Sequence, residues 1–300
     1  MTSETDVAAP VTPCSAMMFF VAETPLHAGA ESSGGVIDLP IQREAHTAWP
    51  CVFSSSVKGA WREHACKPGR MPDEDERNAV FGHEGAQFGG ALAVGDLTIL
   101  ALPVRSLNSH FKWVTCNAVL RRFAAAAQRI GFAGAPADIP AKPGDAVGGL
   151  PRAWLACGPN GRLVLEEFAF VGEVEATTTS WSGKIDTWTG LKTGLAGNGL
   201  VVVPDDEFRW FAEHATPVAP HVKLTDKKGV KFGPWYEETL PIDSILYAAV
   251  ECRDARDEGT SLKGAQVLQK AKGALPQYLR VGGNESLGMG WGRVLFEDAR

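Results

Sequence analysis

The sequence lacks a long hydrophobic run: no stretch reaches the roughly 18 consecutive apolar residues that a membrane-spanning helix requires. Residues 1–15 lack the basic start and the apolar centre of a secretory signal, so we expect them to form a flexible polar leader. The six cysteines include no Cys-x-x-Cys pair, which argues against structural zinc and against a disulfide framework. These absences predict a cytoplasmic protein that keeps its thiols reduced and makes no contact with a membrane.

Positive charge is also scarce, because 29 lysines and arginines face 35 aspartates and glutamates and leave a net charge of −6. Nucleic-acid-binding domains are ordinarily basic overall, so the composition argues against bulk, nonspecific binding of that kind. The basic residues nevertheless gather locally, at Lys58 with Arg62 and within residues 223–231, which leaves room for a basic groove on an acidic body. With 300 residues and 45% hydrophobic content, the chain can bury the core of one large domain or of two small ones.

The hydrophobic pattern changes between the periods of strands and helices. The apolar run 16–23 lies between two prolines and predicts a buried strand. Residues 117–130 place Leu120, Phe123 and Ala127 on one side and predict an amphipathic helix. Together the elements predict an α+β protein, with a ferredoxin-like sheet that is backed by helices and carries large insertions. The other expected elements are helices at 54–66 and 260–275, and strands at 92–104, 162–176, 244–252, 278–281 and 291–296.

Two segments interrupt this pattern. Residues 131–161 are rich in glycine, alanine and proline and show little periodicity, so we expect a long, partly mobile insertion. Residues 177–200 are mostly polar but contain Trp181 and Trp188, and we expect a protruding, thumb-like hairpin there. Tryptophans on such a hairpin can wedge against bases, as aromatic residues do in single-strand-binding proteins, or they can pack against a neighbouring subunit.

A dense run of unusual residues lies between Thr24 and Glu63. It contains Pro-Leu-His27-Ala-Gly, then Val-Ile-Asp38-Leu-Pro-Ile-Gln-Arg-Glu, then three serines before Val-Lys58-Gly-Ala-Trp-Arg. The pattern predicts a strand that ends in a glycine loop with a histidine and an aspartate, followed by a serine-capped helix with two cations. Free backbone N–H groups at a helix start, with a lysine one turn later, suit a phosphate; an ordinary capped helix with solvated cations is the alternative.

This run resembles the RAMP superfamily of CRISPR proteins and, more narrowly, the backbone subunits of type III-B (Cmr) effector complexes. The resemblance extends in order over residues 17–296. The chain departs from the family pattern at Ala48, where glycine is expected, and in the 131–161 insertion. Further matching segments are Phe81-Gly82, Pro103-Val-Arg-Ser-Leu, Trp113-Val-Thr-Cys116, Leu240-Pro241 and Gly282-Gly-Asn-Glu-Ser-Leu-Gly-Met-Gly-Trp.

The resemblance implies a single RAMP domain over residues 16–300, with an RRM-like palm and a protruding thumb. Members of this family stack head-to-tail along a guide RNA and cut the paired target RNA at regular intervals. The expected partners are therefore guide (CRISPR) RNA, single-stranded target RNA, further copies of the chain in an open-ended filament, and the other subunits of the Cmr complex. No membrane partner is expected.

The residues expected to contact RNA lie at the helix start, in the Asp38 loop, in the glycine-rich segment near the C-terminus and in the expected hairpin. A tight turn is the alternative role for the glycines, because they let backbone segments approach closely. The set is Ser54, Ser55, Ser56, Lys58, Arg62, Arg43, Gly282, Gly283, Asn284, Gly288, Gly290, Trp181 and Trp188.

The predicted chemistry centres on Asp38. RNA can be cut without an external nucleophile, because its own 2′-hydroxyl can attack the neighbouring phosphate. A carboxylate is a weak general base at neutral pH but a good ligand for a divalent ion such as Mg²⁺ or Mn²⁺, which would supply positive charge. The family resemblance places the essential aspartate at Asp38, which we therefore predict to be both catalytic and a metal ligand.

Three further residues are candidates for catalysis. Histidine exchanges protons near neutral pH, so His27 can transfer a proton, although it can equally bond loop backbone or guide RNA. The resemblance places Glu237 and Glu238, which precede Leu240-Pro241, near the cut; surface charge is their alternative role.

Two other functions stay open at the level of the sequence. One is a scaffold that binds RNA and positions the target without cutting it. The other is a guide-processing nuclease that uses His27 without a metal ion. The Asp38 loop favours the cutting subunit over both.

Overall fold

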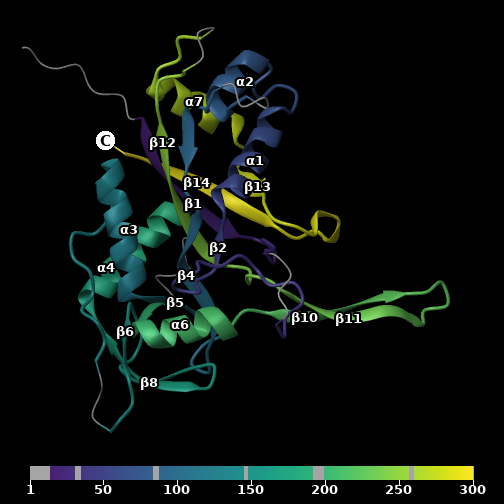
Figure 1. Cartoon of the computed structure of the whole chain (residues 1–300). Coiled ribbons are helices and arrows are strands. Elements are labelled where there is room, and N and C mark those ends of the chain that lie inside the picture. Colours follow the sequence, from purple (N-terminus) through teal and green to yellow (C-terminus); the bar gives the residue numbers. More distant parts are fainter. Residues whose placement is uncertain are drawn as a thin grey trace, which may run out of the picture.

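A large mixed sheet forms the body of the molecule, and helices pack on it and around its ends (Figure 1). This arrangement confirms the predicted α+β class, while the RRM-like description of the palm stays a prediction. The structure is a computed structural model, and it describes residues 14–30, 35–83, 88–144, 148–191, 199–256 and 260–299.

Strand β1 (Ser15–Ala22) lies inside the sheet, because it pairs antiparallel with β12 (Ile245–Cys252) on one side and β14 (Trp291–Asp298) on the other. Its near-continuous apolar sequence is buried, as expected for a strand with both neighbours present. The sheet order is β13-β14-β1-β12-β4-β5-β9-β6-β8-β7, with β2 beside β4 and β3 beside β12. The other bounds are β2 Cys51–Val52, β3 Leu92–Val94, β4 Leu97–Arg105, β5 Phe111–Cys116, β6 Arg152–Leu155, β7 Gly161–Leu165, β8 Phe168–Val174, β9 Leu200–Val203 and β13 Tyr278–Arg280.

The helices bury the faces that their periodicity predicts. In α1 (Ser54–Ala65) the buried residues are Val57, Trp61 and Ala65, each four positions apart, and the Trp61 indole N–H donates to the Ala271 carbonyl over 3.0 Å. Helix α3 (Asn117–Ile130) buries the expected apolar side against the sheet and is capped by Gly131, whose φ is +74°. The remaining bounds are α2 Glu74–Phe81, α4 Ala176–Thr189, α6 Asp205–His214, α7 Gly264–Ala274 and the 3₁₀ helix η1 Glu285–Leu287.

A long antiparallel hairpin projects away from the body of the molecule (Figure 1). Its strands are β10 (Val218–Leu224) and β11 (Val230–Glu238), and their pairing leaves most of the hairpin exposed. Phe232 near the tip is 67% exposed, and the neighbouring lysines add positive charge. The turn between β13 and β14, which holds the glycine-rich segment, extends on the same side of the body in Figure 1.

The predicted thumb-like hairpin at 177–200 is wrong for the described residues 177–191, most of which belong to helix α4. Trp181 is fully buried and Trp188 is 3% exposed; their rings pack around Phe123 at centroid distances of 5.7 and 5.1 Å. The two tryptophans are seven positions apart and so share one helix face. The threonines and serines around them make the segment polar in composition, and this hides the buried face. Neither tryptophan is therefore available to stack on RNA bases.

The structure describes most of the predicted insertion at 131–161 and places part of it in the sheet. Its described residues lie mostly outside regular structure, but they include β6 in the sheet, and Phe132 packs on Phe123. Residues 145–147, residues 192–198 of the expected thumb and residues 1–13 of the expected leader lie outside the described residues.

Candidate active site

The Asp38 loop runs beside the inner end of β11 like an added strand. Leu39 and Glu237 form a parallel bridge, in which the Leu39 N–H donates to the Tyr236 carbonyl and the Glu238 N–H donates to the Leu39 carbonyl, both over 3.0 Å. The Tyr236 backbone N–H donates to Asp38 Oδ2 over 2.7 Å. Asp38 is exposed, and this is the one hydrogen bond to its side chain among the described residues. The loop thus presents a carboxylate at the surface in a fixed place.

His27 lies on a segment that pairs with the end of this loop through Gly29 and Ile41, and its side chain is largely buried. Its Nδ1 is 2.7 Å from the Glu238 carbonyl oxygen. A carbonyl only accepts hydrogen bonds, so Nδ1 carries the proton and Nε2 of the neutral ring is left as an acceptor. His27 Nδ1 is also 3.8 Å from Glu237 Oε1, so a carboxylate lies beside the ring. This geometry suits a histidine that takes up a proton at Nε2.

Glu237 is 4% exposed, and polar groups surround its carboxylate. The Asn284 side-chain N–H donates to Oε1, and His221 Nε2 lies 3.9 Å from Oε2. The structure therefore brings together three predicted site residues, His27, Glu237 and Asn284, next to the strand that anchors Asp38. Sequence reasoning missed His221, because no motif surrounds it.

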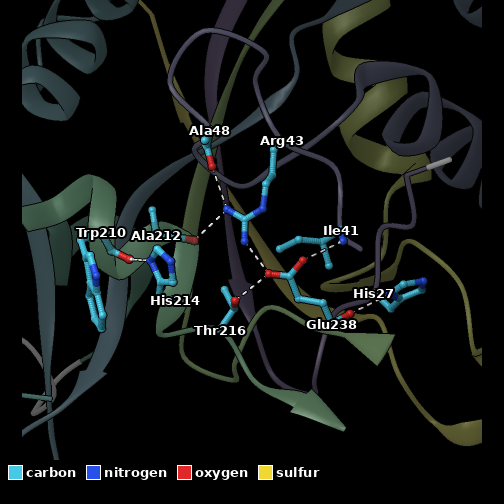
Figure 2. Close-up of polar contacts among 9 residues, drawn as sticks. All are labelled: His27, Ile41, Arg43, Ala48, Trp210, Ala212, His214, Thr216 and Glu238. Atoms are coloured by element: carbon cyan, nitrogen blue, oxygen red, sulfur yellow. Dashed lines mark hydrogen bonds and ion pairs between the residues drawn. The ribbon is translucent and has the colours of Figure 1, made fainter. Parts of the chain in front are cut away.

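Glu238 faces the opposite side of β11 and has a structural role (Figure 2). Its carboxylate accepts from the Arg43 guanidinium, from Thr216 Oγ1 over 2.6 Å and from the Ile41 N–H over 3.1 Å. Arg43 also donates to the carbonyls of Ala48 and Ala212, each over 2.7 Å. The structure thus assigns both groups to a clamp within the fold, and none of their contacts supports the predicted roles of Glu238 in catalysis and of Arg43 in RNA binding.

Two more polar residues of the Asp38 motif also hold the chain in place. Gln42 donates from Nε2 to the Gly29 carbonyl over 3.1 Å and accepts from the Phe53 N–H over 2.7 Å. Glu44 accepts both hydrogen bonds of a bidentate pair with Arg122, each 2.7 Å long. Burial raises the pKa of Glu44, but the hydrogen bond from Arg122 and further contacts outweigh it and hold the pKa below its ordinary value. The motif is thus mainly a scaffold that positions Asp38.

The start of α1 differs from the predicted phosphate cradle. The Ser54 N–H donates to Asp96 Oδ1 over 2.7 Å, so a carboxylate already occupies this end of the helix. Lys58 Nζ donates to the Leu92 carbonyl over 2.7 Å, and burial, followed by the charge of Arg62, lowers its pKa.

Arg62 donates to the Gly82 carbonyl and to Asn78 Oδ1, at the end of α2. The contacts of Lys58 and Arg62 thus hold neighbouring loops rather than forming one phosphate site with the helix start, and RNA binding by these two residues stays a prediction. RNA contacts by Ser55 and Ser56 stay a prediction.

The glycine-rich turn packs tightly on the His27 segment. Gly282 has a φ of +87°, and a Cβ there would overlap the His27 carbonyl oxygen, which accepts from the Gly283 N–H over 2.7 Å. Gly290 has a φ of +86°, and a Cβ there would overlap the Val281 carbonyl. Gly288, with a φ of +77°, faces open space. The glycines at 282 and 290 thus serve close backbone approach, which was the alternative considered for them.

A groove of about 830 Å³ separates the start of α1 from the glycine-rich turn. It brings together Ser56, Gly282 and Gly283, which were predicted to contact RNA. The Nε2 atom of His64 and the Nε atom of Arg280 are buried without a hydrogen-bond partner in the described structure, and both residues line this groove. Tyr278, Trp291 and Lys67 also line it, which supplies aromatic faces and a cation.

The residues around Asp38 bear on the prediction that this side chain binds a divalent metal ion. Among the described residues, no group of three or more His, Cys, Asp and Glu side chains could hold a metal ion. Asp38 offers a single exposed carboxylate, and Glu237 is buried among other partners. Mg²⁺ commonly binds through one or two carboxylates together with substrate phosphates and water. The site fits an ion held jointly with RNA, and it does not fit a cage built by the protein alone.

Comparisons with known proteins agree with this architecture. The family model for the RAMP superfamily matches residues 19–294, and the chain belongs to that superfamily. Within it, the chain is 31% identical over 290 residues to the CRISPR system Cmr endoribonuclease Cmr4 of Pyrococcus furiosus, covering 92% of this chain and 93% of that one.

Two solved structures are also similar to this chain. The crystal structure of oligomeric Cmr4 from Pyrococcus furiosus has a TM-score of 0.73 and 25% identity, covering 95% of this chain and 98% of that one. The cryo-EM structure of the type III-B Cmr-beta complex bound to cognate target RNA contains a chain with a TM-score of 0.73 and 20% identity, covering 94% of this chain and 96% of that one; this likeness concerns the fold alone. Within the described part of the chain, no helix has the length and apolarity needed to cross a membrane.

Proposed function

We propose that this chain is the backbone subunit of a type III-B CRISPR effector complex, and that it cleaves target RNA paired to a guide RNA. The observation that carries the proposal is the exposed Asp38 carboxylate, which is anchored on β11 beside the buried His27–Glu237 pair. The 31% identity to a Cmr endoribonuclease over nearly the whole chain supports the same reaction.

The reaction is an attack by the 2′-hydroxyl oxygen of a ribose on the adjacent phosphorus. The new O–P bond forms while the bond from phosphorus to the 5′-oxygen of the next nucleotide breaks. This leaves a 2′,3′-cyclic phosphate, and water supplies the proton that turns the departing oxygen into a 5′-hydroxyl. His27 Nε2 accepts the proton of the attacking hydroxyl, because Nδ1 is held as a donor by the Glu238 carbonyl. The Glu237 carboxylate stabilises the imidazolium that results. Asp38 faces the strand being cut.

A divalent cation, Mg²⁺ or Mn²⁺, is part of this proposal. Asp38 would hold it together with phosphate oxygens of the RNA, and it would supply positive charge to the phosphate. Glu44, Asp96 and Glu238 are engaged in hydrogen bonds within the scaffold and do not take part.

RNA and further copies of the chain are the proposed partners. Guide RNA follows the groove between α1 and the glycine-rich turn, where Ser56, Gly283 and Lys67 meet. The β10–β11 hairpin, rather than residues 177–200, is the thumb. Copies stack head-to-tail and other Cmr subunits cap the filament; the Pyrococcus furiosus relative is itself oligomeric in its crystal structure. All six cysteines are free, which fits a reducing, cytoplasmic setting.

The decisive experiment compares Asp38→Ala with Asp226→Ala in the assembled complex. Asp226 is exposed at the hairpin tip and provides the matched control for loss of one carboxylate. Asp38→Ala should abolish cleavage of a complementary RNA while guide binding and assembly persist, and Asp226→Ala should cut normally. A chelator should stop the wild-type reaction. Cleavage by the Asp38→Ala complex at the wild-type rate would contradict the proposal and favour another catalytic residue; a wild-type complex that binds target without cutting would favour the scaffold.

A further inference from the structure

An imidazole that the reaction above does not use lies at the root of the hairpin. His221 in β10 pairs across the strands with Trp235 in β11, and their rings stack at a centroid distance of 5.8 Å and an interplanar angle of 25°. The His221 Nε2 atom is 3.9 Å from Glu237 Oε2, which is the distance of an ion-pair contact rather than of a hydrogen bond.

The strand register places His221 on the same face as Glu237. Ala219 pairs with Glu237 and His221 pairs with Trp235, so His221 and Glu237 are diagonal neighbours across the hairpin. The pairing shifts by one residue immediately after His221, between His221 and Lys223. Such bulges increase the local twist and re-aim side chains, and they are common next to active sites. The orientation of His221 therefore comes from a local irregularity of the hairpin.

Glu237 lies between two imidazoles. Its Oε1 accepts from Asn284 and faces His27 Nδ1 at 3.8 Å, while its Oε2 faces His221 at 3.9 Å. The terminal torsion of a glutamate is broad, so the carboxylate turns freely unless groups on both oxygens fix it. Asn284 fixes one oxygen and His221 is the group next to the other.

We propose that His221 is a positioning residue: it orients the Glu237 carboxylate so that this group faces His27 during proton transfer. The inference rests on the proposed function, because it assigns the partner that sets up the His27–Glu237 pair. The hairpin thereby contributes to the reaction, because its root supplies the His221 imidazole next to Glu237.

The test uses the complex assembled on guide RNA and measures the single-turnover rate of target cleavage across a range of target concentrations. His221→Gln removes the ring, and His221→Phe keeps a ring for stacking on Trp235 but removes the nitrogen. Both should lower the rate at saturating target about tenfold while the half-saturating target concentration stays the same. His214→Gln is the control, since His214 on α6 contacts Trp210 and not Glu237.

A double-mutant cycle then separates positioning from general loss of structure. If His221 acts through Glu237, the double variant His221→Gln/Glu237→Gln should cut no more slowly than Glu237→Gln alone. Additive losses would overturn the inference, as would a His221→Phe variant that cuts at the wild-type rate. A rise in half-saturating target concentration with an unchanged saturated rate would also overturn it, since His221 would then be an RNA contact.

Failure of the proposed function would give a different pattern of results from failure of this inference alone. In that case the wild-type complex does not cut, or Asp38→Ala cuts as well as wild type. Failure of the inference alone leaves the wild type active, Asp38→Ala inactive and His221→Gln equal to wild type. The unfolding temperatures of all variants should match that of the wild type within a few degrees. If His221→Gln unfolds at a lower temperature, the cleavage rate of His221→Phe is compared with the wild type instead.

Discussion

Asp38 accepts a hydrogen bond from the backbone N–H of Tyr236, almost two hundred positions later in the chain, over 2.7 Å. The contact fastens the exposed carboxylate to the same strand whose next two residues hold His27. The Glu237 carboxylate lies beside the His27 ring, and the Glu238 carbonyl fixes the tautomer of that ring. The relative placement of the carboxylate and the imidazole thus depends on one short length of β11.

We expect Arg43→Met to destabilise the fold by about 3 kcal/mol, because it leaves the buried Glu238 carboxylate without its cation. Urea unfolding measures the loss. Arg209→Met is the control, since the Arg209–Glu213 pair is exposed and should contribute little. Equal stability of Arg43→Met and wild type would contradict the clamp, and any remaining folded Arg43→Met complex should still bind guide RNA.

Acid should weaken the Glu44–Arg122 pair. The folded-state pKa of Glu44 lies below its ordinary value of 4.5, so the folded state holds its proton less tightly than the unfolded chain. The stabilisation is therefore complete above about pH 4.5 and disappears as the pH falls through the folded-state pKa. We expect Glu44→Gln to cost about 1 kcal/mol at pH 7, allowing for solvent at the partly exposed Arg122. The difference from wild type in urea unfolding should shrink below pH 4.5; a difference that grows there would contradict the assignment.

Ala48→Gly should stabilise the protein. Ala48 has a φ of +59°, a left-handed conformation that costs a residue with a Cβ about 1 kcal/mol or more. Relief of this strain should exceed the extra entropy that glycine gives the unfolded chain, for a net gain of roughly 0.5–1 kcal/mol. Ala45→Gly, in the same turn but without a positive φ, should instead lower stability slightly. In thermal unfolding, the unfolding temperature of Ala48→Gly should rise above that of the wild type, and that of Ala45→Gly should fall slightly below it.

Gly282→Ala and Gly288→Ala form a second matched pair. Both positions have a positive φ, so alanine is strained at either one. At Gly282 the added Cβ would also meet the His27 carbonyl, whereas at Gly288 it enters open space. We expect Gly282→Ala to displace the His27 segment and reduce cleavage at least tenfold, and Gly288→Ala to lose about 1 kcal/mol of stability with near-normal cleavage. Equal cleavage by the two variants would show that the turn does not hold His27.

The sequence predicts the regular elements well where one periodicity dominates. The buried run of β1 and the apolar side of α3 are both present within a residue or two of the expected bounds. The family resemblance led to the expectation of glycine at position 48, and the left-handed backbone there agrees with it. The periodicity of strands and helices depends on neighbours in the chain, so it can be evaluated without tertiary contacts.

The partners of charged side chains could not be predicted in the same way. Arg43 and Glu238 are 195 positions apart, and nothing near either residue in the sequence indicates a shared clamp. Lys58 and Arg62 fit a phosphate site by spacing, but strand β3 and the residue after α2 offer them carbonyl oxygens that only the fold brings near. The predictions for Trp181 and Trp188 are wrong for a related reason, because polar residues around them conceal a helix face that the core covers.

Glu237 and Glu238 are adjacent, yet one belongs to the candidate chemistry and the other to the internal clamp. Neighbouring side chains on a strand alternate in direction, so sliding β11 by a single position would put a different residue at each of these two places. A shift in one direction would leave Arg43 facing Thr239 without its counter-ion, and a shift in the other would place Tyr236 beside His27 in place of Glu237. Insertions or deletions in the hairpin can therefore be tolerated only toward its tip, beyond the bulge at His221, where added length does not reach this pair of glutamates.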